Sequence, residues 1–164
     1  QEALAKRARI KFSGRLICVH LRSVTPFTLE ESNADGPTWQ AFFDKHAAEG
    51  VCDFLLIGDD VLPAGLTLGR GMTRAVDLGI ELATQLALTS IADGFIGMAS
   101  GLCTAANLSE VPHVIFKHPA HHSDAMAIEL GSSVSFPFAN QRQQLWRREA
   151  VSASLDEALS LILS

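Results

Sequence analysis

The sequence predicts an α/β fold: a Rossmann-like, three-layer domain with a mostly parallel sheet and helices on both faces. Two observations lead to this prediction. Short apolar runs alternate with segments of helical periodicity along the chain, which is the pattern of repeated β–α–β units. Several of these runs are apolar throughout, as in strands covered on both faces. Crossovers between such strands are right-handed.

Length and composition fit one such domain. The chain has 164 residues, of which 48% are hydrophobic, and a formal net charge of −5. The apolar content excludes intrinsic disorder, and the acidic balance argues against a nucleic-acid partner. No apolar run reaches the roughly 18–20 residues of a membrane span. Cys18, Cys52 and Cys103 lie far apart in apolar runs, which predicts buried free thiols and a cytoplasmic location.

The first half of the chain is expected to contain three strands and a long helix. The run RLICVHLR is rich in Ile and Val, and the run VCDFLLI ends at a Gly-Asp-Asp turn. Between them, Pro37 opens a helical pattern and Gly50 stops it. The expected elements are a linker or N-terminal helix over residues 1–14, a strand over 15–22, a helix over 37–49, a strand over 51–57 and a short strand over 73–78.

The second half repeats the alternation. Leucine and alanine recur at three- and four-residue steps in the next helix, and Val111-Pro112 halts the one after it. Ser154 and Glu157 form a capping-box pattern before the last helix. The expected elements are a helix over 81–92, a strand over 95–99, a helix to about 109, a strand over 113–116, a short helix ending at 130, an extended segment over 131–138, an unassigned stretch over 139–150 and a helix over 155–163.

Ligands of parallel sheets bind at the carboxyl ends of the strands, near a switch in strand order. Gly97, Ser100 and Gly101 lie where a predicted strand passes into a helix. The N–H groups of such a turn favour an anion, and Ser100 is suited either to cap the helix or to bind a ligand. A plain strand-to-helix turn is the alternative interpretation.

Other candidate residues follow neighbouring strands. His20 and Arg22 end the first strand, and a guanidinium matches phosphate oxygens, although a core histidine and a structural ion pair are equally consistent. Asp59 follows the second strand as a ligand-facing carboxylate or a turn former. His118 opens a histidine-rich loop, H-x-x-H-H-x-D, for which a ligand-facing or a solvated role is favoured over a metal site.

The segment from Asp77 to Pro112 resembles the carboxyl-terminal, donor-binding half of GT-B-fold glycosyltransferases. It contains IAD, FIG, SG and VP at spacings similar to those of heptosyltransferases, and His20-x-Arg22 resembles a strand end of fucosyltransferases. The resemblance implies a metal-independent donor domain without a cofactor, in which Arg22, Gly97, Ser100, Gly101 and Thr104 receive the diphosphate of a nucleotide sugar. It also implies that residues 15–164 are a fragment of a two-domain protein, whose missing N-terminal domain supplies the catalytic base.

Two other functions stay open. Ala99 and Thr104 stand where heptosyltransferases have Asp or Asn and His, which favours a non-catalytic ligand-binding or assembly module. A small stand-alone enzyme acting on a phosphorylated metabolite would instead use Asp59, His118 or His121 as acid or base.

Overall fold

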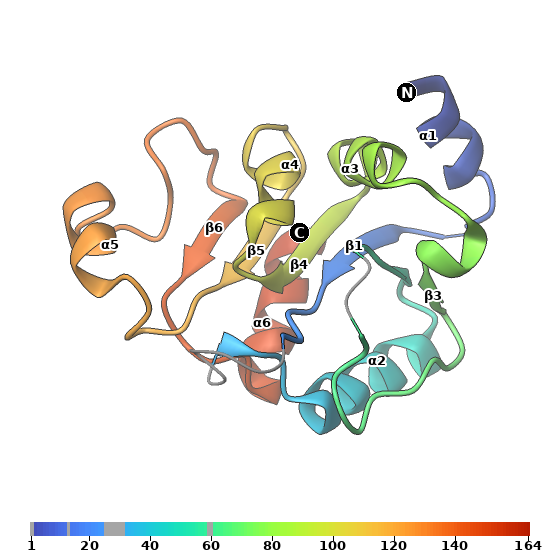
Figure 1. The fold of residues 1–164 in the computed structure, drawn as a ribbon, viewed down its shortest axis with the longest axis horizontal. Coiled ribbons are helices and arrows are strands. Elements are labelled where there is room, and N and C mark those ends of the chain that lie inside the picture. The colour runs from blue at the N-terminus through green and yellow to red at the C-terminus, as the bar shows by residue number, and fades with distance from the viewer. Residues whose placement is uncertain (1, 13, 25–31, 59–60) are drawn as a thin grey trace.

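The computed structural model describes residues 2–12, 14–24, 32–58 and 61–164. Its centre is one sheet of six parallel strands in the order β3–β2–β1–β4–β5–β6 (Figure 1). The strands are β1 (Leu16–His20), β2 (Asp53–Leu56), β3 (Met72–Arg74), β4 (Gly94–Met98), β5 (His113–Phe116) and β6 (Gln143–Trp146). The predicted Rossmann-like, parallel architecture is therefore confirmed.

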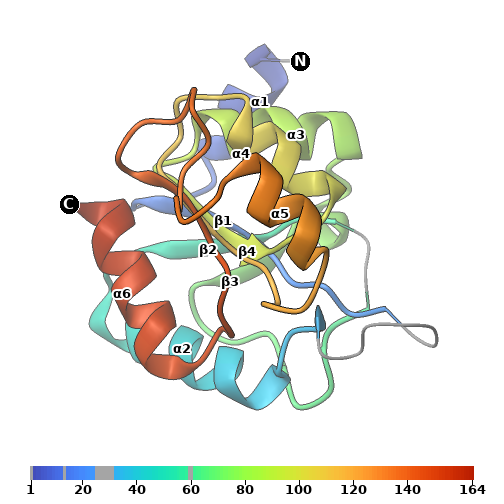
Figure 2. The same cartoon turned by 90° about the vertical axis from the view of Figure 1, so that its left-hand side faces the viewer.

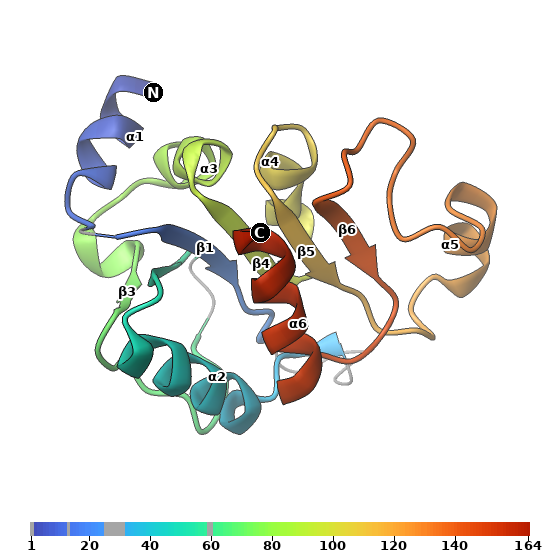
Figure 3. The same ribbon diagram turned by 180° about the vertical axis from the view of Figure 1, so that it is seen from behind.

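Helices cover both faces of this sheet (Figure 2). The helical segments are α1 (Glu2–Arg9), α2 (Gly36–Glu49), the 3-10 turn η2 (Val76–Leu78), α3 (Leu82–Ile91), the 3-10 turn η3 (Gly101–Cys103), α4 (Thr104–Asn107), α5 (Ser123–Glu129) and α6 (Ser152–Leu163). Helices α2 and α6 pack together on one face, and α1, α3 and α4 lie on the other (Figures 2 and 3). Helix α5 lies beyond β6 at one end of the sheet (Figure 1).

Alternation along the strands divides the core into two apolar layers. In β1, Ile17 and Val19 face α2 and α6, whereas Leu16 and Cys18 face α1, α3 and α4. All five residues of this strand are buried, as expected for a central parallel strand. The layer under α2 contains contacting aromatic rings from two elements: Trp39, Phe42, Phe43 and Phe54.

The N-terminal segment is partly helical, and α1 packs on α3. Ala5 is fully buried in this contact. The Arg9 guanidinium pairs with the carboxylate of Asp93, and the same carboxylate accepts a hydrogen bond from the N–H of Leu16 at 2.7 Å. One acidic residue therefore connects the first helix, the start of β1 and the turn before β4.

Two expectations for the last quarter of the chain were wrong. Residues 131–138 form turns rather than an extended segment. The last strand, β6, lies instead in the stretch 139–150 that was left unassigned. Helix α6 begins at Ser152, three residues before its predicted start, so Ser154 is not its N-cap. The hydroxyl of Ser154 instead accepts the N–H of Val151 and donates to backbone carbonyls.

Among the described residues, no helix combines the length and the apolar character needed to cross a bilayer. All three cysteines are free and buried, and burial raises the pKa of Cys18 and Cys52 to about 12 and that of Cys103 to about 11.

Candidate functional site

The strand order changes direction between β1 and β4. After β1 the chain builds outward through β2 and β3, then returns to place β4 on the other side of β1. In doubly wound sheets a ligand occupies the crevice outside the carboxyl ends of the strands at such a switch point. His20 and Gly97 are paired across this switch, so two of the residues predicted from sequence meet there.

Gly97 has a packing reason for being glycine. A Cβ atom at this position would lie 2.5 Å from the carbonyl oxygen of His20 and 3.0 Å from its nitrogen. Both atoms belong to the backbone of the neighbouring strand and have no room to move. The close approach of β1 and β4 therefore depends on Gly97.

His20 is enclosed at the same place and is only 2% exposed. Its Nδ1 lies 3.4 Å from the carbonyl oxygen of Ile57. Gly58 follows with a φ of +95°, and a side chain there would crowd both His20 and Leu102. The imidazole is thus packed between the end of β2 and the turn that follows β4, as in a satisfied core histidine.

The Ser100–Gly101 turn leads from β4 into η3 and α4. Ser100 has extended backbone angles, and its hydroxyl caps the turn by accepting the N–H of Leu102 at 3.1 Å. Gly101 is exposed, and a Cβ there would have no atom within 4 Å. Thr104 is also exposed, at the start of α4. The surface in front of this turn is therefore open to a ligand.

A pocket of about 240 Å³ lies on the α2 side of the same edge. Met98, at the end of β4, lines it, so the pocket adjoins the Ser100 turn two residues later. The other lining residues come from the start of α2, the loop after β5 and the segment before α6: Asn33, Asp35, Thr38, His118, Arg148, Glu149, Ala150 and Val151.

His118, for which a ligand-facing and a solvated role were both open, is one of the residues that line this pocket. Its Nδ1 accepts the N–H of Ala120 at 3.3 Å. An accepting Nδ1 places the proton of the neutral ring on Nε2, which is left to donate a hydrogen bond.

Arg22 is bonded within its own loop. Its Nη1 donates to Oδ1 of Asn33 at 3.1 Å, and the amide of Asn33 also bonds to the backbone of Val24. Asn33 lines the pocket and Arg22 does not, so Arg22 is connected to the pocket lining through this hydrogen bond. Asp59 and Asp60 fall outside the described residues.

The start of α2 is already occupied by an acidic group. A carboxylate oxygen of Asp35 accepts the N–H of Thr38 at 3.0 Å. Hydrogen bonding with the side chain of Thr38 first, and with its backbone N–H in addition, holds the pKa of Asp35 below its usual range. A carboxylate at the N-cap satisfies the positive end of the helix. Among the helices that begin at this edge, α2 is therefore a poor anion site.

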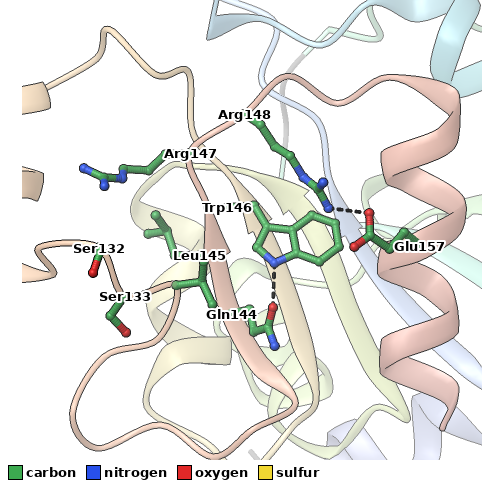
Figure 4. A pocket seen from close by; sticks show the side chains of 9 residues that line it. Ser132, Ser133, Gln144, Leu145, Trp146, Arg147, Arg148 and Glu157 are labelled. Atoms are coloured by element: carbon green, nitrogen blue, oxygen red, sulfur yellow. Dashed lines mark hydrogen bonds and ion pairs between the residues drawn. The ribbon is translucent and has the colours of Figure 1, made fainter.

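Arg148 is a pocket residue that sequence reasoning missed. It lines both the pocket of about 240 Å³ and a larger hollow of about 460 Å³ outside β6. Figure 4 shows the larger hollow. Its guanidinium carbon lies 3.7 Å from the ring centroid of Trp146, and Nη2 donates to Glu157 at 2.7 Å. The larger hollow is at the sheet's end, away from the switch in strand order.

Within the described ranges, no group of three or more His, Cys, Asp or Glu side chains is arranged to hold a metal ion. No known family model matches the chain, and no curated protein or solved structure matches it either.

Proposed function

We infer that the chain is the donor-binding domain of a GT-B-type glycosyltransferase, which binds a nucleotide sugar outside the carboxyl ends of β1 and β4. The observation that supports this most is the strand order β3–β2–β1–β4–β5–β6, with an open Ser100–Gly101 turn and a pocket at its switch point. The sugar-nucleotide class comes from the resemblance of residues 77–112 to heptosyltransferases.

The turn and the pocket take different parts of the donor. The diphosphate lies against the Ser100–Gly101 turn, where backbone N–H groups and the open face of Gly101 admit it. The remainder of the donor extends into the pocket past Met98, where Nε2 of His118 is available to donate a hydrogen bond. The leaving diphosphate is stabilised by preorganised donors, which is electrostatic catalysis.

Arg22 supplies positive charge to the bound donor. In the structure its guanidinium bonds to the neutral amide of Asn33. A phosphate carries a full negative charge and can accept two parallel N–H bonds from a guanidinium, which an amide oxygen cannot match, so a bound donor draws Arg22 towards itself. In this proposal a second domain supplies the catalytic base and binds the acceptor. The two domains act together in the cytoplasm.

Thermal unfolding with added nucleotide tests the proposal. UDP, GDP and ADP are titrated to millimolar concentration, each beside a nucleotide sugar such as UDP-glucose or GDP-mannose. At ten times the dissociation constant, a ligand stabilises the fold by about 1.4 kcal/mol. That corresponds to a rise in melting temperature of roughly 3–6 °C for a chain of this size. No shift with any nucleotide would overturn the proposal.

Substitutions at two glycines, Gly101 and Gly69, test where the nucleotide binds. Gly101→Ala adds a methyl group to the open face of the turn and leaves the fold unstrained, so nucleotide affinity should fall. Gly69→Ala is the matched control, because its Cβ would also meet only an ordinary contact, 3.7 Å from Asp44, far from the site. Binding of diphosphates with no preference for nucleotide sugars would favour the ligand-binding module instead.

A further inference from the structure

Lys117 is a buried lysine at the carboxyl end of β5. Its N–H donates to the carbonyl oxygen of Trp146 at 2.9 Å, and the carbonyl oxygen of the preceding Phe116 accepts the N–H of Ala99 at 2.8 Å. The backbone at this point is therefore bonded to the chain after β4 on one side and to β6 on the other. Lys117 directly follows the last residue of β5.

Strand alternation fixes the face on which its side chain lies. Val114 and Phe116 belong to the apolar layer under α2 and α6, whereas Ile115 belongs to the layer under α3 and α4. Lys117 is two residues beyond Ile115 and so shares its face. Since Met98 pairs with Phe116, Lys117 lies beside Ala99, one residue before the Ser100–Gly101 turn.

The charge of Lys117 is not neutralised locally. The residue is 8% exposed, yet across the part of the chain that the structure describes its ammonium makes no hydrogen bond and no ion pair within 4.0 Å. Burial lowers the pKa of Lys117, and Glu129 and Cys103 oppose this only through longer-range attraction. The stem of Lys117 is therefore buried, whereas its ammonium keeps some contact with solvent and has no close partner among the described residues, which leaves it available to an anion.

Other cations near this edge do have partners. Arg22 bonds to Asn33, Arg147 donates to the carbonyl oxygen of Gly131, and Arg148 pairs with Glu157. Lys117 therefore differs from these three residues in combining burial with the lack of a close partner.

We propose that Lys117 is the cation of an anion-binding site, in which its ammonium pairs with a phosphate oxygen held against the Ser100–Gly101 turn. The turn contributes N–H groups, the Ser100 hydroxyl and an open glycine face, and the lysine contributes the charge. The identity of the ligand as a nucleotide sugar rests on the proposed function, whereas the site itself requires only a diphosphate.

Isothermal titration with inorganic pyrophosphate and with UDP, GDP and ADP tests this site. Lys117→Met keeps the length of the stem and removes the charge, so affinity for pyrophosphate should fall about tenfold or more. The melting temperature of this variant should stay the same or rise, because burial disfavours the charge that is removed and no close partner is lost. Lys11→Met is the matched control: it removes the same charge from an exposed lysine and should leave the affinity unchanged.

A second measurement uses the unmodified chain. Reductive methylation followed by peptide mass spectrometry reports how reactive each lysine is. Pyrophosphate should protect Lys117 and leave Lys11 unprotected.

The outcomes separate the two proposals. Equal pyrophosphate affinity in Lys117→Met and the parent chain, or no protection of Lys117, overturns the assignment of Lys117. If the assignment of Lys117 holds but no nucleoside diphosphate binds more tightly than pyrophosphate, the anion site stands and the nucleotide-sugar function falls. If neither pyrophosphate nor any nucleotide binds, both proposals fall.

Discussion

His46 and Asp156 join the two helices that cover one face of the sheet: Nε2 of His46 lies 2.8 Å from Oδ1 of Asp156. The other carboxylate oxygen of Asp156 accepts Lys45 Nζ at 2.7 Å. Lys45 first, and His46 in addition, hold the pKa of Asp156 below its usual range. One acid on α6 thus binds two bases on α2.

Asp156→Ala should lower the free energy of unfolding by about 1–2 kcal/mol, because it leaves the imidazole of the buried His46 without its acceptor. Urea unfolding followed by circular dichroism measures the change. Glu49→Ala is the control, since the Glu49 carboxylate is half exposed and only 3.4 Å from His46 Nδ1 in an i,i+3 contact. Equal losses in the two variants would contradict the role given to Asp156.

Gly97→Ala should destabilise the chain by about 2 kcal/mol or more, because the new methyl group meets the backbone of His20 and must separate β1 from β4. Melting temperature measures the loss. Gly101→Ala is its counterpart in open space and should change stability by less than about 0.5 kcal/mol. Similar melting temperatures for both variants would show that β1 and β4 can accommodate a methyl group at residue 97, contrary to the structure.

Burial lowers the pKa of His113 from 6.5 to about 4. Between these two pH values the unfolded chain binds a proton at this residue and the folded chain does not, so stability rises with pH across that window. The neutral imidazole therefore contributes up to about 3 kcal/mol above pH 6.5, which is lost as the pH falls towards 4.

Urea unfolding from pH 4 to pH 7 should show this slope in the parent chain and a flatter one in His113→Gln. His122→Asn is the control, because His122 is exposed and asparagine tolerates its left-handed backbone. A slope unchanged by His113→Gln would assign the pH dependence to other groups.

Arg148→Ala should uncover the ring of Trp146, over which the guanidinium now lies. Quenching of tryptophan fluorescence by acrylamide should increase, and the signal is specific because Trp39 is fully buried. Stability should fall by only about 0.5–1 kcal/mol, the usual size of an exposed cation–π contact. Arg147→Ala should leave quenching unchanged, since Arg147 bonds to Gly131 instead.

The sequence was informative where local signals bound an element. The strand predicted over 113–116 matches β5, because Pro112 and a polar loop enclose an apolar run. By contrast, β6 contains two glutamines, and Nε2 of Gln143 bonds to the carbonyl oxygens of Ser109 and Val111. These partners lie more than thirty residues away, so no local pattern marks Gln143 as a buried strand residue.

The candidate site also contains parts that local sequence predicts and parts that it does not. The Ser100–Gly101 turn was predictable, because a strand followed by small residues and a helix is a local pattern. Lys117 and Arg148 were not predictable as site residues, because their roles depend on burial and on contacts with residues in other elements of the fold. The backbone of Lys117 bonds to Trp146, and Arg148 pairs with Glu157. From sequence alone, a lysine next to His118-Pro119 is predicted to be solvated, and only the neighbouring strands in the structure show that it is buried.

The central position of β1 and β4 has a kinetic consequence. The hydrogen bond from Leu16 to Asp93 closes a segment of 77 residues, and the β1–β4 ladder begins at the same place. Closing so long a loop costs entropy before the pairing repays it. The chain should therefore fold slowly for its size, with the β1–β2 half able to form first and the future ligand crevice assembled only when β4 docks.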